Sequence, residues 1–491
     1  MRSQFTGTLV ALLQDQQRYE LPIGIRIQNA IRRQLGNGSL KAFDRLPSSR
    51  LLAKELAVAR ETVEFAYQHL EAEGYIIRQQ GSGTFVSETG AQLATFKSSP
   101  GGKSRSLRLS ERGKKIFRSG GVHDPVPIAF HAAYPDVRSF PLDLWRQTAS
   151  RVSKRLGTNA LTYCDPQGLE QLREEISRYL GAYRGVRCSP ENVVVLTSSQ
   201  EALLLITTMM LDPGDQLAVE DPGYPGIRSA LAVSGATALP IDVDHNGMLV
   251  DHLIRRSPAP RGAYVTPSHQ YPTTATLSLE RRVALIDWAK ANRSFIIEDD
   301  YDSEYRYDGA PISCIQGLDT SGNVFYLGTF TKTMFPAIRL AYLVAPKELV
   351  PPLVAMRTLV DGHSAILNQA ILAEFMATGE FTAHIRRMRQ LFKARRDAFV
   401  EAVDRHLAPF GSLQIPAGGF QATWHLYDGG LETEVRRKAE QQGILLPSLG
   451  ELFIRRGGTP GFVLGFAALT PQESYAAVVR LMRVIKNIRK H

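Results

Sequence analysis

An alternation of short apolar runs and helix-length segments over residues 128–491 constrains the fold of this chain most strongly. Runs such as VVVL at 193–196, FIIE at 295–298 and VFYL at 324–327 have the length of buried strands. The segments between them are long enough for helices that cross over a sheet. Strands that are apolar throughout and separated by helices form mostly parallel sheets covered on both faces. The fold class expected for this region is therefore α/β.

The composition excludes several other classes of protein. The chain has 491 residues, of which 44% are hydrophobic, which excludes a disordered or fibrous chain. No apolar run approaches the ~18 residues of a membrane span. The apolar patch near the amino terminus is broken by Gln14 and Asp15, so we expect no signal peptide. The cysteines Cys164, Cys188 and Cys314 are odd in number and lack metal-ligand spacing, so we expect no metal site and a reducing, cytoplasmic location.

Residues 88–127 differ in composition from the regions on either side. They are rich in Ser, Gly and basic residues, and from Glu88 to Val126 eight Lys and Arg stand against three Asp and Glu. This segment thus carries half of the chain's net charge of +10. Such a composition buries little apolar surface, which predicts a flexible basic linker, with non-specific contact to phosphates as the alternative. The linker separates a domain at 1–87 from a domain at 128–491.

The domain at 1–87 shows the periodicity of short helices. Apolar residues recur every four positions from Ile23 to Leu35, which predicts an amphipathic helix ending near Gly36. Ser48 is expected to cap a second helix that runs through Leu56.

A turn at 57–59 then leads to a third helix with apolar residues from Val63 to Leu70. Two short helices joined by such a turn form a helix-turn-helix, whose second helix enters the major groove of DNA. The following YIIRQQGSGTFVS reads as two strands around the tip at 81–83, where glycine lets the backbone approach phosphates.

The run LPSSRLLAKELAVARETVEFAYQHLEAEGYIIRQQGSGTFV resembles the winged helix-turn-helix domain of the GntR regulators nearly position for position. The resemblance implies binding to double-stranded DNA and places Tyr67 and Leu70 in the core. The DNA contacts that it implies are Arg50, Arg60, Thr62 and Gly81.

In the large domain, a lysine and several groups suited to an anionic cofactor follow the strand-sized runs. Lys332 lies in a small hydroxyl-rich loop just beyond 324–327, where desolvation can lower its pKa until the neutral amine forms a Schiff base. Arg339, seven residues on, suits a bidentate phosphate clamp. Ser199 and Gln200 start a helix whose amides can cradle a phosphate. The acids that end the run at 294–300 can hold the proton of a pyridinium, as pyridoxal phosphate requires.

The order of these elements resembles the fold-type I, aspartate-aminotransferase-like proteins that bind pyridoxal 5′-phosphate. With the winged helix in front, residues 20–491 resemble the MocR subgroup of GntR regulators. The resemblance makes Lys332 the Schiff-base lysine, Asp299 the partner of the pyridine nitrogen, and Tyr301 the partner of the phenolic oxygen. Tyr224 would stack on the ring, and Tyr163 would reach the cofactor of the partner subunit in a homodimer. The phosphate cup would comprise Ser199, Gln200, Thr329, Thr331 and Arg339.

Two positions depart from the aminotransferase pattern. In SHQYPTTAT, Tyr271 stands where those enzymes have an Asn and Thr274 where they have a Gly, while SHQ followed by an aromatic residue and Pro is typical of MocR proteins. In GFVLGFAAL, Val463 stands where members that bind an α-carboxylate have an Arg. Either this salt bridge is lost, or Arg455 or Arg456 replaces it from the preceding loop.

The sequence thus predicts a dimeric regulator whose winged helices read a paired or repeated DNA site and whose large domain senses a small molecule. An effector amine would displace Lys332 from the cofactor and bias the tethered DNA domains. The effector is either an amine or unusual amino acid, or pyridoxal phosphate itself. Two alternatives remain: a true aminotransferase with an added DNA domain, and a DNA-binding protein whose large domain serves only for dimerisation.

Overall fold

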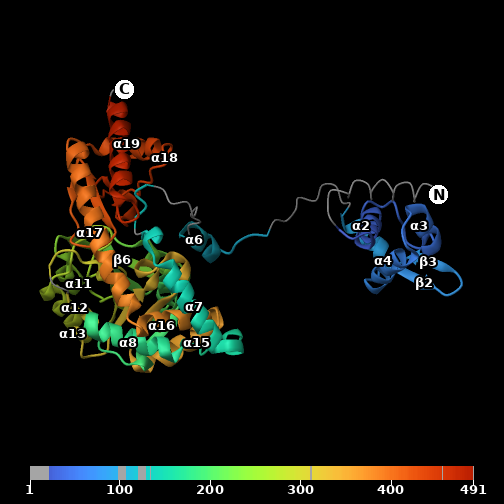
Figure 1. The fold of residues 1–491 in the computed structure, drawn as a ribbon, viewed down its shortest axis with the longest axis horizontal. Coiled ribbons are helices and arrows are strands. Elements are labelled where there is room, and N and C mark those ends of the chain that lie inside the picture. The colour runs from blue at the N-terminus through green and yellow to red at the C-terminus, as the bar shows by residue number, and fades with distance from the viewer. Residues whose placement is uncertain are drawn as a thin grey trace. The chain divides into compact units, whose positions relative to one another are not determined.

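The computed structural model describes residues 21–97, 107–119, 129–132, 134–309, 312–455 and 457–489. The chain folds into two compact units, Met1–Arg108 and Leu109–His491 (Figure 1). Among these described residues, no helix is long and apolar enough to cross a membrane.

The first unit is a small helical domain with a three-stranded antiparallel sheet. Its elements are α2 (Ile23–Gly36), β1 (Arg45–Leu46), α3 (Ser49–Leu56), α4 (Arg60–Ala72), β2 (Ile76–Gln79), β3 (Gly83–Val86) and α5 (Glu88–Lys97). The strand order is β1-β3-β2, so the hairpin around residues 81–83 is the predicted wing. The core consists of the apolar stripes of α2 and α4, including Ile27, Ile31, Leu35, Val63, Tyr67 and Leu70. The predicted helices and strands are confirmed.

Local contacts set the angle between α3 and α4. Ser48 caps α3, because its Oγ accepts a hydrogen bond from the Leu51 backbone N–H at 3.3 Å. Ala57 ends α3 in the left-handed conformation, at φ 53°. The Tyr67 hydroxyl then donates to the Pro47 carbonyl at 2.9 Å, which ties α4 to the residue before the cap. These contacts fix a helix-turn-helix.

The segment expected to be a linker contains two helices. Residues 88–97 form α5, which packs on α2 and starts where Ser87 Oγ accepts from the Gly90 N–H at 2.8 Å. Residues 111–119 form α6 (Glu111–Ser119), which belongs to the second unit and packs on α10 (Pro225–Ser234). Residues 98–106 and 120–127 lie outside the described residues, so flexibility there stays a prediction.

The second unit is built on an eight-stranded sheet in the order β4-β11-β10-β9-β8-β5-β6-β7. Every neighbouring pair from β10 to β6 is parallel, whereas β11 runs antiparallel to both of its neighbours and β7 is an antiparallel edge. This confirms a mainly parallel sheet. The strands are β4 (Val193–Leu196), β5 (Gln216–Asp221), β6 (Thr237–Asp244), β7 (Gly247–Met248), β8 (Gly262–Val265), β9 (Phe295–Asp300), β10 (Val324–Thr329) and β11 (Ala341–Val344).

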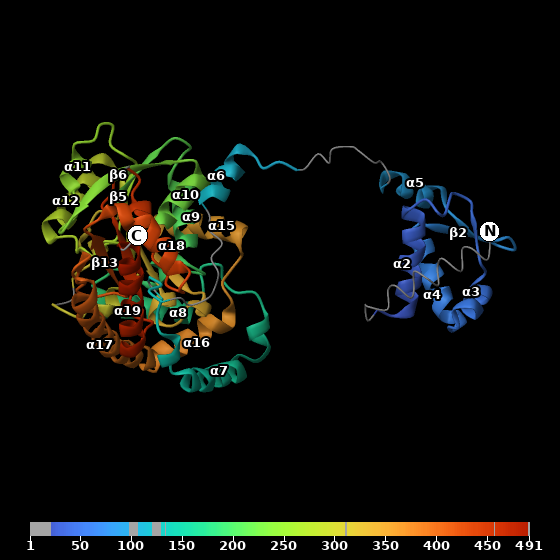
Figure 2. The same ribbon diagram turned by 90° about the horizontal axis from the view of Figure 1, so that it is seen from above.

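Helices cover both faces of this sheet (Figure 2). Val194 and Leu196 of β4 pack with α9 (Ser199–Met210) and α10, whereas Val193 and Val195 pack with α8 (Glu170–Arg184) and α16 (Ile366–Ala377). Because alternate residues of one strand reach two different cores, β4 is apolar throughout. The helices are α7 (Leu142–Leu156), α8 (Glu170–Arg184), α9 (Ser199–Met210), α11 (Val250–Ile254), α12 (Leu279–Asn292), α13 (Ile315–Leu318), α14 (Phe330–Thr333), α15 (Val350–Val360) and α16 (Ile366–Ala377).

The carboxyl-terminal part of the second unit packs two long helices on a three-stranded antiparallel sheet. Helix α17 (Glu380–Leu407) lies beside α19 (Pro471–Arg489), as Figure 1 shows. The sheet has the order β12-β13-β14, and its elements are β12 (Gly411–Gln414), β13 (Gln421–Leu426) and β14 (Gly461–Gly465), with α18 (Glu432–Glu440) between the last two strands.

Candidate functional site

A cavity of about 290 Å³ lies where several strands of the large sheet end. Nine of the ten predicted cofactor residues line it: Ser199, Gln200, Tyr224, Asp299, Tyr301, Thr329, Thr331, Lys332 and Arg339. The tenth, Tyr163, does not line the cavity. Four further residues line the cavity: Ser198, Tyr264, Thr266 and Tyr271. Of these, the sequence had singled out only Tyr271, as the residue at the position of the aminotransferase Asn. The predicted residues in the cavity lie at the carboxyl ends of β4, β5, β9 and β10 or in the segments that follow them. Ligands bind at this edge of open α/β sheets.

Lys332 lies on the one-turn helix α14, directly after β10. Thr329 caps this helix, because its Oγ1 accepts from the Thr331 N–H at 3.2 Å and contacts Thr331 Oγ1 at 2.8 Å. The lysine is half-buried and faces the cavity. Desolvation lowers the pKa of Lys332 to about 8. The negative charges of Asp302 and Asp299 act in the opposite direction and partly offset this effect. A substantial fraction of the amine is therefore neutral and nucleophilic near neutral pH.

This shifted pKa predicts that Lys332 destabilises the cofactor-free protein. Because the folded state disfavours the ammonium form, we expect Lys332→Met to raise the free energy of unfolding at pH 7 by about 1–3 kcal/mol. The cost is fully present below pH 8, and it disappears as pH rises from about 8 toward the ordinary lysine value of 10.5. Urea unfolding of the two proteins from pH 7 to 10.5 measures this difference. A difference that grows with pH would contradict the prediction.

Asp299 is held at the end of β9 with one oxygen engaged and the other available. Its Oδ2 accepts a hydrogen bond from the Tyr264 hydroxyl at 2.7 Å. Its Oδ1 is buried and has no hydrogen-bond partner among the described residues. Burial raises the pKa of Asp299 to about 7. A buried carboxylate oxygen without a partner is costly unless a ligand satisfies it, and the protonated nitrogen of a pyridine ring is such a ligand.

The cavity is also lined by the amino terminus of α9. Ser198 caps this helix by accepting from the Glu201 N–H at 3.1 Å, so Ser199 and Gln200 occupy its first turn. The Gln200 side chain donates to the Gly226 carbonyl at 2.9 Å and so ties α9 to α10. The first-turn amides and the nearby Arg339 guanidinium suit a phosphate.

Two tyrosines shape the middle of the cavity. The rings of Tyr224 and Tyr271 meet edge to face at 5.9 Å. Burial raises the pKa of each to about 12, so both remain neutral hydroxyls. Gly226 makes room for this arrangement, since a Cβ there would lie 2.2 Å from the Tyr224 ring and 2.4 Å from Gln200 Oε1.

The loop that carries Tyr271 contains a strained residue. Thr274 has φ 65°, a left-handed conformation that β-branched residues rarely adopt, and its N–H bonds to the Gln270 carbonyl at 2.7 Å. We expect Thr274→Gly to stabilise the protein by roughly 0.5–1 kcal/mol, as the relieved strain exceeds the added entropy of the unfolded chain. Thermal unfolding measures the gain. Thr273→Gly is the matched control and should destabilise, because Thr273 Oγ1 bonds Gln270 Oε1 at 2.6 Å.

The position predicted to lack a carboxylate anchor is apolar in the structure. Val463 lies on β14, is fully buried, and forms a cluster with Leu449 and Leu452 against which Tyr271 and Phe453 pack. The alternative anchor Arg455 binds the Asp242 carboxylate at 2.7 Å instead. Arg456 lies outside the described residues. Of the described residues that line the cavity, the cationic ones are Lys332 and Arg339.

Tyr163 is almost fully exposed, at 94%, and its ring meets that of His363 edge to face at 5.9 Å. An exposed tyrosine on the surface can serve a second copy of the chain. Its predicted role in the partner's site stays a prediction.

The predicted DNA contacts lie on the helix-turn-helix and the wing of the first unit. Arg50 on α3 and Arg60 at the start of α4 are exposed, and Thr62, two residues after Arg60 in the first turn of α4, is half-buried. Gly81 at the wing tip has φ 78°, with nothing within 4 Å of the site of a Cβ. The sequence had not indicated Arg78.

Arg78 joins the wing to the recognition helix. From β2, its guanidinium forms ion pairs with Glu64 at 2.5 Å and Glu71 at 3.2 Å. Glu64 and Glu71 are spaced by seven residues on α4, so they lie on one helix face. Two acids on one helix face are the sequence feature that could have predicted an ion pair with Arg78. The wing and α4 are thus held together as one surface.

Comparison with known proteins finds a matching family for each of the two domains. Residues 25–86 match the family described as bacterial regulatory proteins, gntR family, and residues 133–451 match aminotransferase class I and II. The solved structure of LysN, an α-aminoadipate aminotransferase from Thermus thermophilus complexed with N-(5′-phosphopyridoxyl)-L-leucine, superposes with a TM-score of 0.69 at 26% identity. It covers 78% of this chain and 96% of that one.

Two relatives named as regulators match more than nine tenths of this chain. The probable rhizopine catabolism regulatory protein MocR of Rhizobium meliloti is 35% identical over 92% of each chain. The pyridoxine biosynthesis transcriptional regulator PdxR of Corynebacterium glutamicum is 31% identical over 91% of this chain and 92% of that protein. A winged helix joined to an aminotransferase fold defines a class of two-domain transcriptional regulators. The chain belongs to that class, and within it to the MocR subgroup of the GntR family.

Proposed function

We propose that this regulator binds pyridoxal 5′-phosphate in the cavity of its aminotransferase-like domain and uses it to sense a small molecule. The observation that carries the proposal is the convergence of Lys332, the unpartnered Asp299 Oδ1 and the α9 amino terminus on one cavity. These are the groups that an aldehyde, a pyridine nitrogen and a phosphate require. The domains would be 1–87 for DNA, 88–127 as the linker and 128–491 for the cofactor.

The predicted residues that line the cavity would hold the cofactor. Asp299 would keep the proton on the ring nitrogen, Tyr224 would pack on the ring face, and Tyr301 would bind the phenolic oxygen. Lys332 would meet the aldehyde with its amine. The phosphate is held by Ser199, Gln200, Thr329, Thr331 and Arg339, with Tyr163 reaching the partner subunit's cavity in a homodimer. When bound, the cofactor supplies an aldehyde that reacts reversibly with primary amines.

The apolar surroundings of Val463 favour two classes of effector. A ligand with an α-carboxylate would find no cation for it beyond Lys332 and Arg339 among the described lining residues. The effector is therefore pyridoxal phosphate itself, or an amine that does not depend on a carboxylate salt bridge. The first class is favoured by the similarity to a regulator named for pyridoxine biosynthesis.

Helix α6 offers a route from the cavity to the DNA-binding domain. Arg112 of α6 donates a hydrogen bond to the Val233 carbonyl of α10. Ile116 lines a groove whose floor includes Ser198 and Gln200, which also line the cofactor cavity. A phosphate that draws the amino termini of α9 and α10 together would change how α6 packs on α10, and α6 lies within the segment 88–127 proposed as the linker. Differential affinity for two such arrangements is what allostery requires.

The test is binding of the purified protein to the DNA upstream of its own gene, with and without pyridoxal phosphate, at a stated salt concentration. The visible spectrum is recorded beside it. A visible band together with cofactor-dependent DNA affinity supports a sensor of the cofactor. A band without a change in DNA affinity overturns that effector class and leaves the amines. No band overturns cofactor binding, and turnover of an amino donor at ~1–10³ s⁻¹ would establish an enzyme instead.

A further inference from the structure

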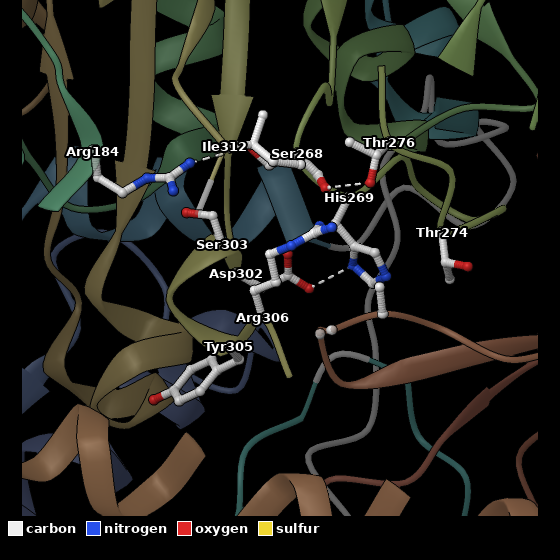
Figure 3. A pocket seen from close by; sticks show the side chains of 13 residues that line it. Arg184, Ser268, His269, Thr274, Thr276, Asp302, Ser303, Tyr305, Arg306 and Ile312 are labelled. Carbon is white, nitrogen blue, oxygen red and sulfur yellow. Dashed lines mark hydrogen bonds and ion pairs between the residues drawn. The ribbon is translucent and has the colours of Figure 1, made fainter. Parts of the chain in front are cut away.

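A second, small cavity, lined mainly by residues with polar side chains, adjoins the cofactor site on the side of the loop at 268–276 (Figure 3). Its lining includes Arg184, His269, Thr274, Asp302 and Arg306. Tyr301 connects the two cavities, because it lines the first and its hydroxyl donates to the His269 carbonyl at 3.0 Å. None of these residues except Tyr301 has a role in the function proposed above.

His269 and Asp302 form a buried pair in this second cavity. Figure 3 shows the two side chains pointing toward one another, with His269 Nδ1 2.9 Å from Asp302 Oδ2. Their side chains are 6% and 2% exposed. The backbone of Gly419 closes over the pair: it has φ 79°, and a Cβ there would lie 2.2 Å from the His269 ring and 2.6 Å from Asp302 Oδ2. The geometry thus leaves the Asp302 carboxylate little freedom to move.

Asp302 and Lys332 follow neighbouring strand ends of the large sheet. Strands β9 and β10 are parallel neighbours, and Asp300, two residues before Asp302, pairs with Gly328, four residues before Lys332. Of the two carboxylates that favour the ammonium form of Lys332, Asp302 has the larger effect and Asp299 the smaller. Asp299 already accepts from Tyr264 and faces the ring nitrogen in the proposed complex. Asp302 therefore remains as the carboxylate that can balance the amine.

Four other charged groups lie near the pair of His269 and Asp302. They are Arg184, Asp300, Glu304 and Arg306. Asp300 forms a buried ion pair with Arg184 at 2.6 Å and also accepts from the Tyr326 hydroxyl at 2.6 Å. Glu304 is half-buried, and desolvation raises its pKa to about 7. Arg306 lines the second cavity on the side of Asp302.

We propose that Asp302 and His269 are positioning residues for Lys332: Asp302 is the buried counter-charge of the amine, and His269 holds Asp302 and Tyr301 in place. The inference rests on the proposed role of Lys332 as the residue that meets the aldehyde. It explains why two buried polar side chains are kept beside the cofactor cavity although neither reaches into it. Asp302 would set how much of the lysine is neutral at a given pH, and thereby how readily the cofactor is exchanged.

The test measures the titration of Lys332 itself, in cofactor-free protein. Competitive labelling with acetic anhydride from pH 6 to 10, read by mass spectrometry of the Lys332 peptide, gives the midpoint for that one amine. Asp302→Asn keeps the shape of the side chain and removes its charge. We expect the midpoint to fall by at least one pH unit, which makes Lys332 up to about tenfold more reactive below the midpoint.

Three further variants separate positioning from a merely structural role. His269→Leu removes the donor to Asp302 and should shift the midpoint in the same direction by a smaller amount, whereas His269→Asn retains a donor near Nδ1 and should restore it. Ser303→Ala, in the same cavity beside Asp302, should leave it unchanged. An Asp302→Asn midpoint within 0.3 units of wild type (a threshold of about 0.4 kcal/mol) overturns the proposal.

Folding and cofactor binding are checked separately. Circular dichroism establishes that each variant is folded. The affinity for pyridoxine 5′-phosphate, which lacks the aldehyde, reports on the phosphate and ring contacts without the reaction at Lys332, and it should change less than about twofold. If Asp302→Asn does not fold, the His269 pair of variants decides, and equal midpoints for Leu and Asn overturn the proposal. Absence of a visible band with pyridoxal phosphate would reject the proposed function but would leave a labelling shift intact, so the two failures are distinguishable.

Discussion

Replacing Lys332 with alanine is expected to abolish the visible band that the protein gains with pyridoxal phosphate, beyond the absorbance of the free cofactor, together with any effect of the cofactor on DNA affinity. Lys332 is the lysine that lines the cavity among the described residues, and its lowered pKa makes it the amine that can react with the aldehyde. Absorbance titration and DNA binding with and without cofactor measure the two effects. DNA binding without cofactor should not change, because the winged helix belongs to the other unit.

Two control variants make this expectation specific. Lys347→Ala removes a lysine from the same domain but outside the cavity, at the start of a short turn before α15, and should leave the spectrum and the response to cofactor unchanged. Arg339→Ala keeps Lys332 and removes the guanidinium at the phosphate end, so it should weaken cofactor binding without removing the band at saturation. A normal band and a normal response in Lys332→Ala would reject covalent sensing and favour a large domain that serves only for dimerisation.

The sequence predicted those features that depend on neighbours along the chain. Ser48 and the period of four residues from Ile23 mark helix boundaries, and the structure has them at the expected residues. The uniformly apolar run at 193–196 indicated a strand buried on both faces, and alternate residues of β4 do reach two cores. The cofactor residues were predicted from the resemblance, and strand ends of a parallel sheet bring nine of them to one cavity.

Contacts between distant residues could not be predicted in this way. Tyr264 reaches Asp299 because β8 and β9 pair in a register that sets Tyr264 opposite Ile297, two positions before Asp299. The Arg455 ion pair with Asp242 spans more than 200 residues. Neither register nor ion pairing follows from periodicity.

The segment at 88–127 shows a second limit of composition. Its many polar residues indicated a linker, but it contains helices at 88–97 and 111–119, the first capped at Ser87 and the second packed on α10. The role of Tyr163 is a third feature that one chain does not test, because its predicted partner belongs to another copy of the chain.

Replacing Arg60 with alanine is expected to weaken binding to the operator by about 1–3 kcal/mol, which is roughly five- to 150-fold. Arg60 is exposed at the start of α4, where a recognition helix presents its side chains to base edges. Arg78 ties the wing to α4 through Glu64 and Glu71, so the loss of one exposed guanidinium should not disturb the surface that carries it. Fluorescence anisotropy at several salt concentrations measures the affinity.

Arg33→Ala is the matched control, because it removes the same charge from the exposed side of α2, away from the predicted contacts. It should reduce affinity for operator and random DNA equally and only slightly, through the net charge. If Arg60 reads a base, its loss weakens operator binding far more than binding to random DNA. If it contacts phosphate alone, both affinities fall together and the salt slope decreases by about one. An unchanged operator affinity would mean that α4 does not enter the groove through its first turn, and the DNA-binding surface would then have to be placed on the wing.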